Sequence, residues 1–183
     1  MKLTTDRLTL RPFNQGDLAD VFKFYSNDQV CQYLLEDPWQ DQDREEKFQE
    51  KLNNHNLDKE SALNLAVLLD NTVIGDISVW YTDMKDTVEL GYVFNPSYSG
   101  QGYAREAVRA VIMELFSTFQ VHRIQANLDA RNTASANLCQ KLGMRREAHF
   151  LQDFWNKGEW TDSYVYGMLE SDLWSFYLQP TKH

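Results

Sequence analysis

A glycine-rich segment near the middle of the chain is the first feature that could carry chemistry. It is Ser99-Gly100-Gln101-Gly102-Tyr103-Ala104, between an expected strand and an expected helix. The first backbone N–H groups of a helix have no partner within the helix, and the helix dipole favours an anion beside them. Glycine lets the backbone turn sharply there and lets a ligand approach closely. The segment therefore predicts a cradle for a phosphate or pyrophosphate group.

The same glycines are also compatible with a tight strand-to-helix turn that binds nothing. Two familiar nucleotide motifs do not account for them. The sequence contains no GxxxxGK(S/T), which excludes a P-loop nucleotide hydrolase. Arg105 stands three residues after Gly102, where GxGxxG requires glycine, so a Rossmann-type site is unsupported.

Other residue types that commonly carry chemistry are dispersed along the chain. No spacing of His and Cys suggests a metal ligand set, so no metal cofactor is expected. A serine nucleophile would need a GxSxG elbow, which the sequence lacks. Cys31 and Cys139 are too few for a disulfide scaffold, and we expect two reduced thiols.

Composition and charge limit the partners. Eighteen basic and 27 acidic side chains give a formal net charge of -9, which argues against nucleic-acid binding, although a local basic patch could hold a small anion. No apolar run approaches a membrane span, and the first residues lack a secretory apolar core. We therefore expect a cytoplasmic protein that does not bind a membrane.

The elements that must position the glycine segment follow from apolar periodicity. Period-two alternation predicts strands at 6–13, 61–69, 72–81, 87–94, 122–128, 147–155 and 159–169. Helical spacing predicts helices from Leu18, from Asp37-Pro38, after Tyr103 and over Asn132–Leu142. Strands that alternate with helices indicate an α/β fold with a mixed sheet of about seven strands and about four helices. No repeat or linker divides the chain, so we expect one domain over residues 1–183.

The amino-acid sequence around the glycine segment resembles that of a known family. ELGYVFNPSYSGQGYAREAV is similar to the acyl-CoA-binding motif of the GNAT superfamily of N-acyltransferases, with Gly102 and Ala104 in its last two fixed places. Ser99 stands where Arg or Gln is usual. DARNTASANLCQKLGM and WNKGEWTDSYVYGMLESDLW extend the resemblance toward the RimJ/RimL branch of ribosomal-protein N-terminal acetyltransferases. The resemblance implies a mostly antiparallel sheet that is splayed beside the acyl-CoA site.

The resemblance also implies which residues hold acetyl-CoA, the co-substrate. The backbone amides from Gly100 to Arg105, after Ser99, would bind its pyrophosphate. Backbone groups of Tyr92, Val93 and Phe94 would pair with the pantetheine arm, and an N–H near Phe94 would polarise the thioester carbonyl. Asn132 would cap the following helix and contact the same arm.

Two side chains are implied as catalytic. Glu89 matches the position of a catalytic glutamate in some members, and a strand carboxylate with no catalytic role is the alternative. His149 and Asp153 are weaker candidates for the base. Ser135 matches a serine assigned to protonate the CoA thiolate, with a helix-cap hydroxyl as the alternative. Cys139 stands where many members have a tyrosine for that role.

Three functions remain open from the sequence. The first is acetylation of a protein N-terminus, and the second is acetylation of a small amine such as a polyamine, an amino acid or an amino-sugar drug. The third is an acyl-CoA-binding module with little catalysis, which the departures at Ser99 and Cys139 motivate. The aromatic tail LWSFYLQPTKH is compatible with a homodimer patch or with packing on the sheet.

Overall fold

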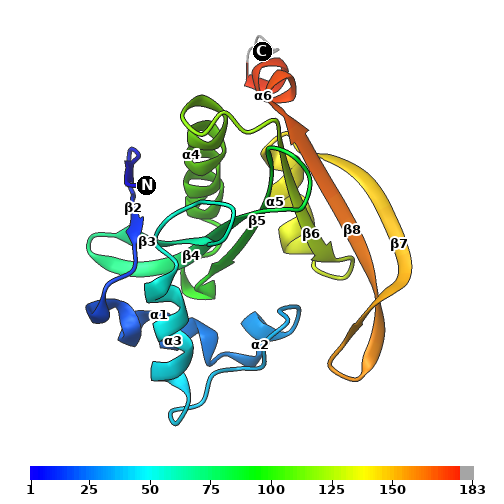
Figure 1. Cartoon of the computed structure of the whole chain (residues 1–183). Coiled ribbons are helices and arrows are strands. Elements are labelled where there is room, and N and C mark those ends of the chain that lie inside the picture. The colour runs from blue at the N-terminus through cyan, green and yellow to red at the C-terminus, as the bar shows by residue number, and fades with distance from the viewer. Residues whose placement is uncertain (178–183) are drawn as a thin grey trace.

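The computed structural model describes residues 1–177, and its strands form one eight-stranded sheet (Figure 1). In sheet order these are β1 (Leu3–Thr4), β2 (Thr9–Pro12), β3 (Leu63–Leu69), β4 (Thr72–Tyr81), β5 (Thr87–Phe94), β6 (Arg123–Asp129), β8 (Glu159–Leu169) and β7 (Arg145–Asn156). The helices are α1 (Leu18–Tyr25), α2 (Asp28–Cys31), α3 (Arg44–Asn53), α4 (Tyr103–Ser117), α5 (Thr133–Lys141) and α6 (Glu170–Tyr177), with single-turn helices η1 (Gln15–Asp17) and η2 (Pro96–Tyr98). No helix in this described part is long and apolar enough to cross a membrane.

Neighbouring strands pair antiparallel except β5 and β6, which run parallel. That parallel ladder has three residue pairs and ends at Glu89↔Gln125, although β5 continues to Phe94. Beyond this point, which we call the fork, the free edge of β5 faces no strand among residues 1–177. The mixed, mostly antiparallel and splayed sheet is thus confirmed.

Helices cover both faces of the sheet, and each buries one apolar stripe. On one face α4 inserts Val108, Val111, Ile112 and Leu115 into the larger core cluster. On the other face α1 and α3 contribute Phe24 and Phe48 to a second cluster. The two clusters therefore lie on opposite faces of the sheet, and the larger one joins strands on both sides of the fork.

A buried charged cluster ties α1, α3 and β4 together. Asp76 on β4 is only 1% exposed, and its Oδ2 accepts from Tyr25 Oη at 2.7 Å and from Lys51 Nζ at 2.6 Å. The ammonium group of Lys51 also lies 4.3 Å from the centre of the Tyr25 ring. A buried ion pair needs such hydrogen bonds because both charges have left water.

Local sequence signals predicted several boundaries correctly. The ranges of β4 and β5 agree with expectation, and their neighbour β3 turns into β4 at Asp70-Asn71, both of which have positive φ. The strand expected at residues 6–13 corresponds to β2, which begins at Thr9 rather than at residue 6. The reason is that the backbone N–H of Arg7 donates to the Glu106 carboxylate at 3.0 Å instead of to a neighbouring strand.

The expected helix start at Asp37-Pro38 is wrong, because the helix, α3, begins at Arg44. Burial of Trp39 overrides the local helix-start signal. The Trp39 ring is 2% exposed and stacks on Tyr25 at 4.7 Å, and its backbone N–H donates to the Tyr25 carbonyl. These contacts hold the segment before α3 against α1.

Short elements also escaped the sequence patterns. β1, α2 and α6 were not expected, and each except α6 has four residues or fewer. Within α6, Leu173 is buried. The rest of the proposed dimer patch falls on the side chains of Trp174, Phe176 and Tyr177 and on residues 178–183, which lie outside the described structure.

Removing the cation of the buried cluster should destabilise the fold. In Lys51→Met the Asp76 carboxylate keeps one of its two partners, and we expect the free energy of unfolding to fall by about 3 kcal/mol. Lys23→Met breaks an ion pair with Asp20 whose lysine side chain is 63% exposed. This control should change stability by less than about 0.5 kcal/mol. Urea denaturation of both variants makes the comparison, and equal effects would contradict the structural role of the cluster.

Candidate functional site

The glycine segment forms a tight turn directly before α4. Gly100 has φ +76° and Gly102, the N-cap of α4, has φ +84°, a left-handed conformation that L side chains rarely adopt. A Cβ added at Gly100 would meet no atom within 4 Å, so its outer side is open. The first N–H groups of a fifteen-residue helix thus begin at an exposed glycine turn. These features fit the predicted anion cradle.

Arg7, in the N-terminal segment, contacts both this turn and the first residues of α4. Its Nη1 donates to the Gln101 carbonyl at 3.0 Å, and its guanidinium pairs with Glu106 on α4 at 2.6 Å. The same guanidinium lies 4.3 Å from the centre of the Tyr103 ring. Sequence analysis missed this contact because the partners are 94 and 99 residues apart.

The free end of β5 leads from the fork to the glycine turn. Tyr92, Val93 and Phe94 all lie beyond the end of the ladder with β6, so they pair with β4 on one edge and with no described strand on the other. Phe94 pairs with Gly75 on β4, and a Cβ at that glycine would overlap the Phe94 ring. Glycine at position 75 therefore leaves the space that the Phe94 ring occupies.

One side chain crosses from the free end of β5 to α5. The hydroxyl of Tyr92 donates to the Ser135 carbonyl at 3.2 Å and lies 3.3 Å from Cys139 Sγ. Asn132 caps α5, as expected, by accepting from the Ser135 N–H at 3.0 Å. Burial raises the pKa of both Tyr92 and Cys139. Ser135 is half-buried in the first turn of α5, beside the fork.

Glu89 stands at the vertex of the fork. Gln125 Nε2 and Asn127 Nδ2, both on β6, donate to its Oε2 at 3.0 and 2.7 Å. Because both donate to the same oxygen, Oε1 keeps its capacity to accept a proton. Burial raises the pKa of Glu89, although these two hydrogen bonds act in the opposite direction. A half-buried carboxylate with a raised pKa is suited to general base catalysis near neutral pH.

Sequence analysis missed both amides that orient Glu89. The alternation in RIQANLD places Gln125 and Asn127 on one face of a strand, which is a usable signal. It does not reveal that β5 is the neighbour of β6, since the two strands are joined through α4. Only the sheet order brings these side chains to Glu89.

A pocket of about 330 Å³ adjoins the fork on the face covered by α1 and α3; we call it the β4–β5 pocket. Its lining is Tyr25, Leu34, Leu35, Glu36, Lys51, Asp76, Ser78, Trp80, Gly91, Tyr92 and Val93. Glu89 pairs directly with Trp80 and Gly91 with Ser78, so these residues share one face of the sheet. The Glu89 carboxylate therefore projects from the face that forms the pocket floor, next to Trp80.

Three charged residues line the β4–β5 pocket. Lys51 and Asp76 form the buried pair described above, and the second oxygen of Asp76, Oδ1, has no hydrogen-bond partner. Glu36 accepts from Trp39 Nε1 at 2.5 Å. Since the Lys51 charge is balanced by Asp76, the lining carries one further negative charge. Such a lining suits a polar or cationic ligand.

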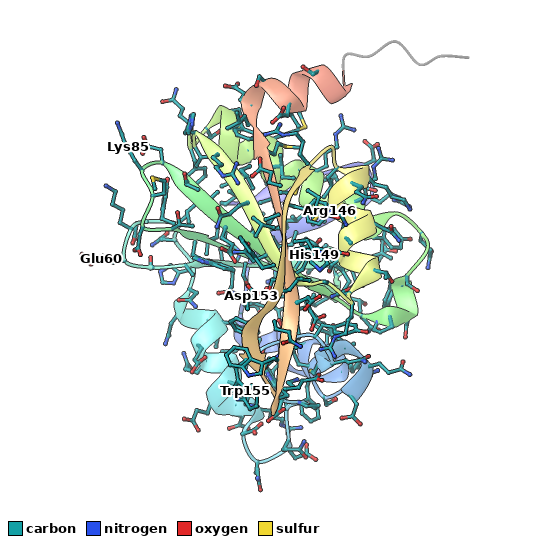
Figure 2. All side chains as sticks on the ribbon, turned by 90° about the vertical axis from the view of Figure 1, so that its right-hand side faces the viewer. Glu60, Lys85, Arg146, His149, Asp153 and Trp155 are labelled. Carbon is teal, nitrogen blue, oxygen red and sulfur yellow. The ribbon has the colours of Figure 1, made fainter. Side chains whose placement is uncertain are left out.

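The weaker candidates for the base lie elsewhere. Figure 2 shows His149 and Asp153 along β7, which β6 and β8 separate from β5 in the sheet. His149 Nε2 lies 3.1 Å from Asp162 Oδ2 on the neighbouring strand. Asp153 is exposed in the irregular stretch between Phe150 and Phe154. The structure therefore brings Glu89, and not these two, to the fork.

Known proteins share this sequence and this fold. The sequence profile described as Acetyltransferase (GNAT) domain matches residues 7–145. The uncharacterized N-acetyltransferase YnaD of Bacillus subtilis is 33% identical over 94% of this chain and 99% of its own length.

Solved structures agree with this match. A GNAT-family acetyltransferase from Bacillus anthracis superposes with a TM-score of 0.83 at 32% identity, covering 93% of this chain and 99% of that one. A spermidine N-acetyltransferase from Vibrio cholerae, solved with CoA and spermine, shares the fold with a TM-score of 0.77 at 21% identity, over 92% and 99% of the two chains. The chain therefore belongs to the GNAT family and is an acetyl-CoA-dependent N-acetyltransferase.

Proposed function

We propose that the chain transfers the acetyl group to a primary amine by direct attack within a ternary complex. The observation that carries this proposal is the fork, where a carboxylate stands at the start of an open strand edge that leads to a glycine turn at a helix N-terminus. Holding a thioester and an amine together at one place supplies much of the acceleration. No residue is required to form a covalent intermediate.

The donor side is built mainly from backbone groups. The amides of Gly100, Gln101, Gly102, Tyr103, Ala104 and Arg105 would hold the pyrophosphate of acetyl-CoA. The edge of β5 at Tyr92, Val93 and Phe94 would pair with the pantetheine arm, and Asn132 would contact the same arm beside its capping role. Ser99 lacks the Arg or Gln side chain usual at that position, but the anion would be held by main-chain N–H groups, which a serine there leaves intact.

The chemical step needs one proton removed and one delivered. The neutral amine nitrogen attacks the thioester carbon, the C–N bond forms and the C–S bond breaks. Glu89 takes the proton from the amine, directly or through one water, and the N–H near Phe94 stabilises the negative oxygen. The Ser135 hydroxyl passes its proton to the departing thiolate and takes one back from solvent water, so that the serine ends the step unchanged.

The acceptor enters from the opposite side, through the β4–β5 pocket. A small amine is supported by the pocket's volume, by the Glu36 carboxylate in a mostly apolar lining, and by a fold neighbour solved with spermine. A protein N-terminus, the acceptor that the RimJ/RimL resemblance implies, is the second candidate. Thiol release from a pooled library of amines and N-terminal peptides separates them. Tight CoA binding without release from any amine would favour a binding module.

The glycine turn should govern donor affinity. Gly102→Ala forces a side chain into the left-handed region, and we expect the dissociation constant of acetyl-CoA, measured by calorimetry, to rise about tenfold. Gly158→Ala is the matched control, since Gly158 has the same φ of +84°. A Cβ added at Gly158 would meet no atom within 4 Å, and one added at Gly102 would make only an ordinary contact, 3.5 Å from Arg7 Nη2. The control should leave acetyl-CoA affinity unchanged. Equal losses in both variants, or no binding by the natural chain, would overturn the assignment of the turn.

Glu89 should set the pH dependence. Because its pKa is raised, Glu89 becomes the active, deprotonated base only above the ordinary range of a glutamate, so kcat/KM should rise with pH through that pKa. Glu89→Gln should lower kcat/KM by roughly a hundredfold and abolish this rise. Asp153→Asn should leave the profile intact. The reverse pattern would transfer the role to the β7–β8 hairpin.

Ser135 should affect release of the thiol. Ser135→Ala removes the proposed donor but keeps the Tyr92 contact, which is to the backbone carbonyl, so kcat should fall about tenfold with little change in acetyl-CoA affinity. Tyr92→Phe removes the neighbouring hydroxyl and is the comparison. A loss confined to Tyr92→Phe would assign the proton to Tyr92 instead.

A further inference from the structure

The segment from Cys31 to Asp37 crosses the open end of the fork. It follows α1 in the N-terminal half of the molecule, yet it contacts the C-terminal half at the tip of the β7–β8 hairpin, as Figure 1 indicates from the proximity of α2 to that tip. Arg131, in the loop after β6, also lies over the Tyr33 ring at 5.8 Å. We call this stretch the crossing segment. It spans two halves whose strands have already diverged.

Two side chains of the hairpin turn fasten the crossing segment. Lys157 Nζ donates to the carbonyl of Cys31 at 2.6 Å and to that of Glu36 at 2.9 Å. Asn156 Nδ2 donates to the carbonyl of Leu34 at 3.3 Å. Three backbone carbonyls of one short segment are thus satisfied by adjacent residues more than 120 positions away.

The turn is shaped to present this lysine. Lys157 has φ +50° and Gly158 has φ +84°, the two positive values that a tight two-residue hairpin turn requires. Trp155, labelled in Figure 2, pairs with Trp160 on the neighbouring strand, with ring centres 5.4 Å apart, directly before the Asn156↔Glu159 pair that closes the turn. The Lys157 side chain is 28% exposed, whereas its acidic neighbour Asp37, 3.8 Å away, is 84% exposed. The carbonyl contacts, not this surface pair, therefore hold the lysine.

The crossing segment supplies a wall of the β4–β5 pocket. Leu34, Leu35 and Glu36 all line that pocket, and Lys157 binds the carbonyls of Cys31, just before them, and of Glu36, the last of them. Two further hydrogen bonds are that of Asn156 with the Leu34 carbonyl and that of the Trp39 indole with the Glu36 carboxylate. Loss of the lysine would remove two of these four hydrogen bonds, including the only one of them at Cys31.

We propose that Lys157 is a positioning residue that fixes the acceptor-side wall and thereby sets affinity for the amine acceptor. This inference rests on the proposed function, which makes the β4–β5 pocket the acceptor site. The donor cradle and Glu89 stand on other elements, so the lysine acts on the acceptor and leaves acetyl-CoA binding and the proton transfer unchanged.

The test compares the natural chain with Lys157→Met, Lys157→Arg and a control, Lys85→Met. Lys85 is exposed and lies at the opposite end of the molecule from the hairpin turn (Figure 2). Steady-state kinetics use spermidine and, as a second probe, a serine-initiated tripeptide. Chymotrypsin cleavage after Tyr33, Leu34 and Leu35 reports the freedom of the crossing segment without any need for activity.

In Lys157→Met we expect the acceptor KM to rise about tenfold and cleavage of the crossing segment to accelerate about fivefold, with kcat and acetyl-CoA KM unchanged. Arginine can donate to the same carbonyls, so Lys157→Arg should keep the acceptor KM and the cleavage rate close to those of the natural chain. Lys85→Met should match the natural chain. Unchanged acceptor KM and cleavage, or an equal loss in kcat and acetyl-CoA affinity, would overturn the proposal. If the natural chain acetylates neither probe, the acceptor assignment fails, while the cleavage rates still decide whether Lys157 holds the segment.

Discussion

The short parallel contact between β5 and β6 is the constraint on which the site depends. Three residue pairs hold the two halves of the sheet together, and after Glu89 the strands separate. A parallel pair needs a long crossover, and here that crossover contains α4 and its glycine turn. The N-terminus of α4 therefore follows the end of β5 that does not pair with β6. One topological feature thus creates both an open strand edge and an anion cradle beside it.

The fork also explains why one carboxylate has an unusual environment. Glu89 belongs to the last pair before separation, so β6 still supplies two amides to orient it, while the space beyond is open to a substrate. One residue earlier, Val88 is fully buried in the core. One step later on the same face, Gly91 already lines the β4–β5 pocket. A position that is both held and accessible is available only at this vertex.

Sequence patterns identified what depends on neighbours along the chain. The glycine turn, the Asn132 cap and the β4 and β5 ranges follow from local geometry, and the structure has them. The Asp37-Pro38 helix start failed because burial of Trp39 against α1 outweighs a capping preference. Arg7, Gln125 and Asn127 reach the site through contacts that span the fold, and no local pattern encodes those pairings.

This division follows the two sides of the reaction. The proposed donor side consists of backbone groups in one continuous stretch from β5 to α4, so a single motif is enough to recognise it. The proposed acceptor side is assembled from α1, the crossing segment, α3 and β4, which meet through the Lys51–Asp76 pair and the hairpin turn. Each of those contacts depends on one or two side chains. Replacing them would reshape the acceptor pocket without disturbing the fork, so relatives can share donor chemistry and fold while differing in the amine they take.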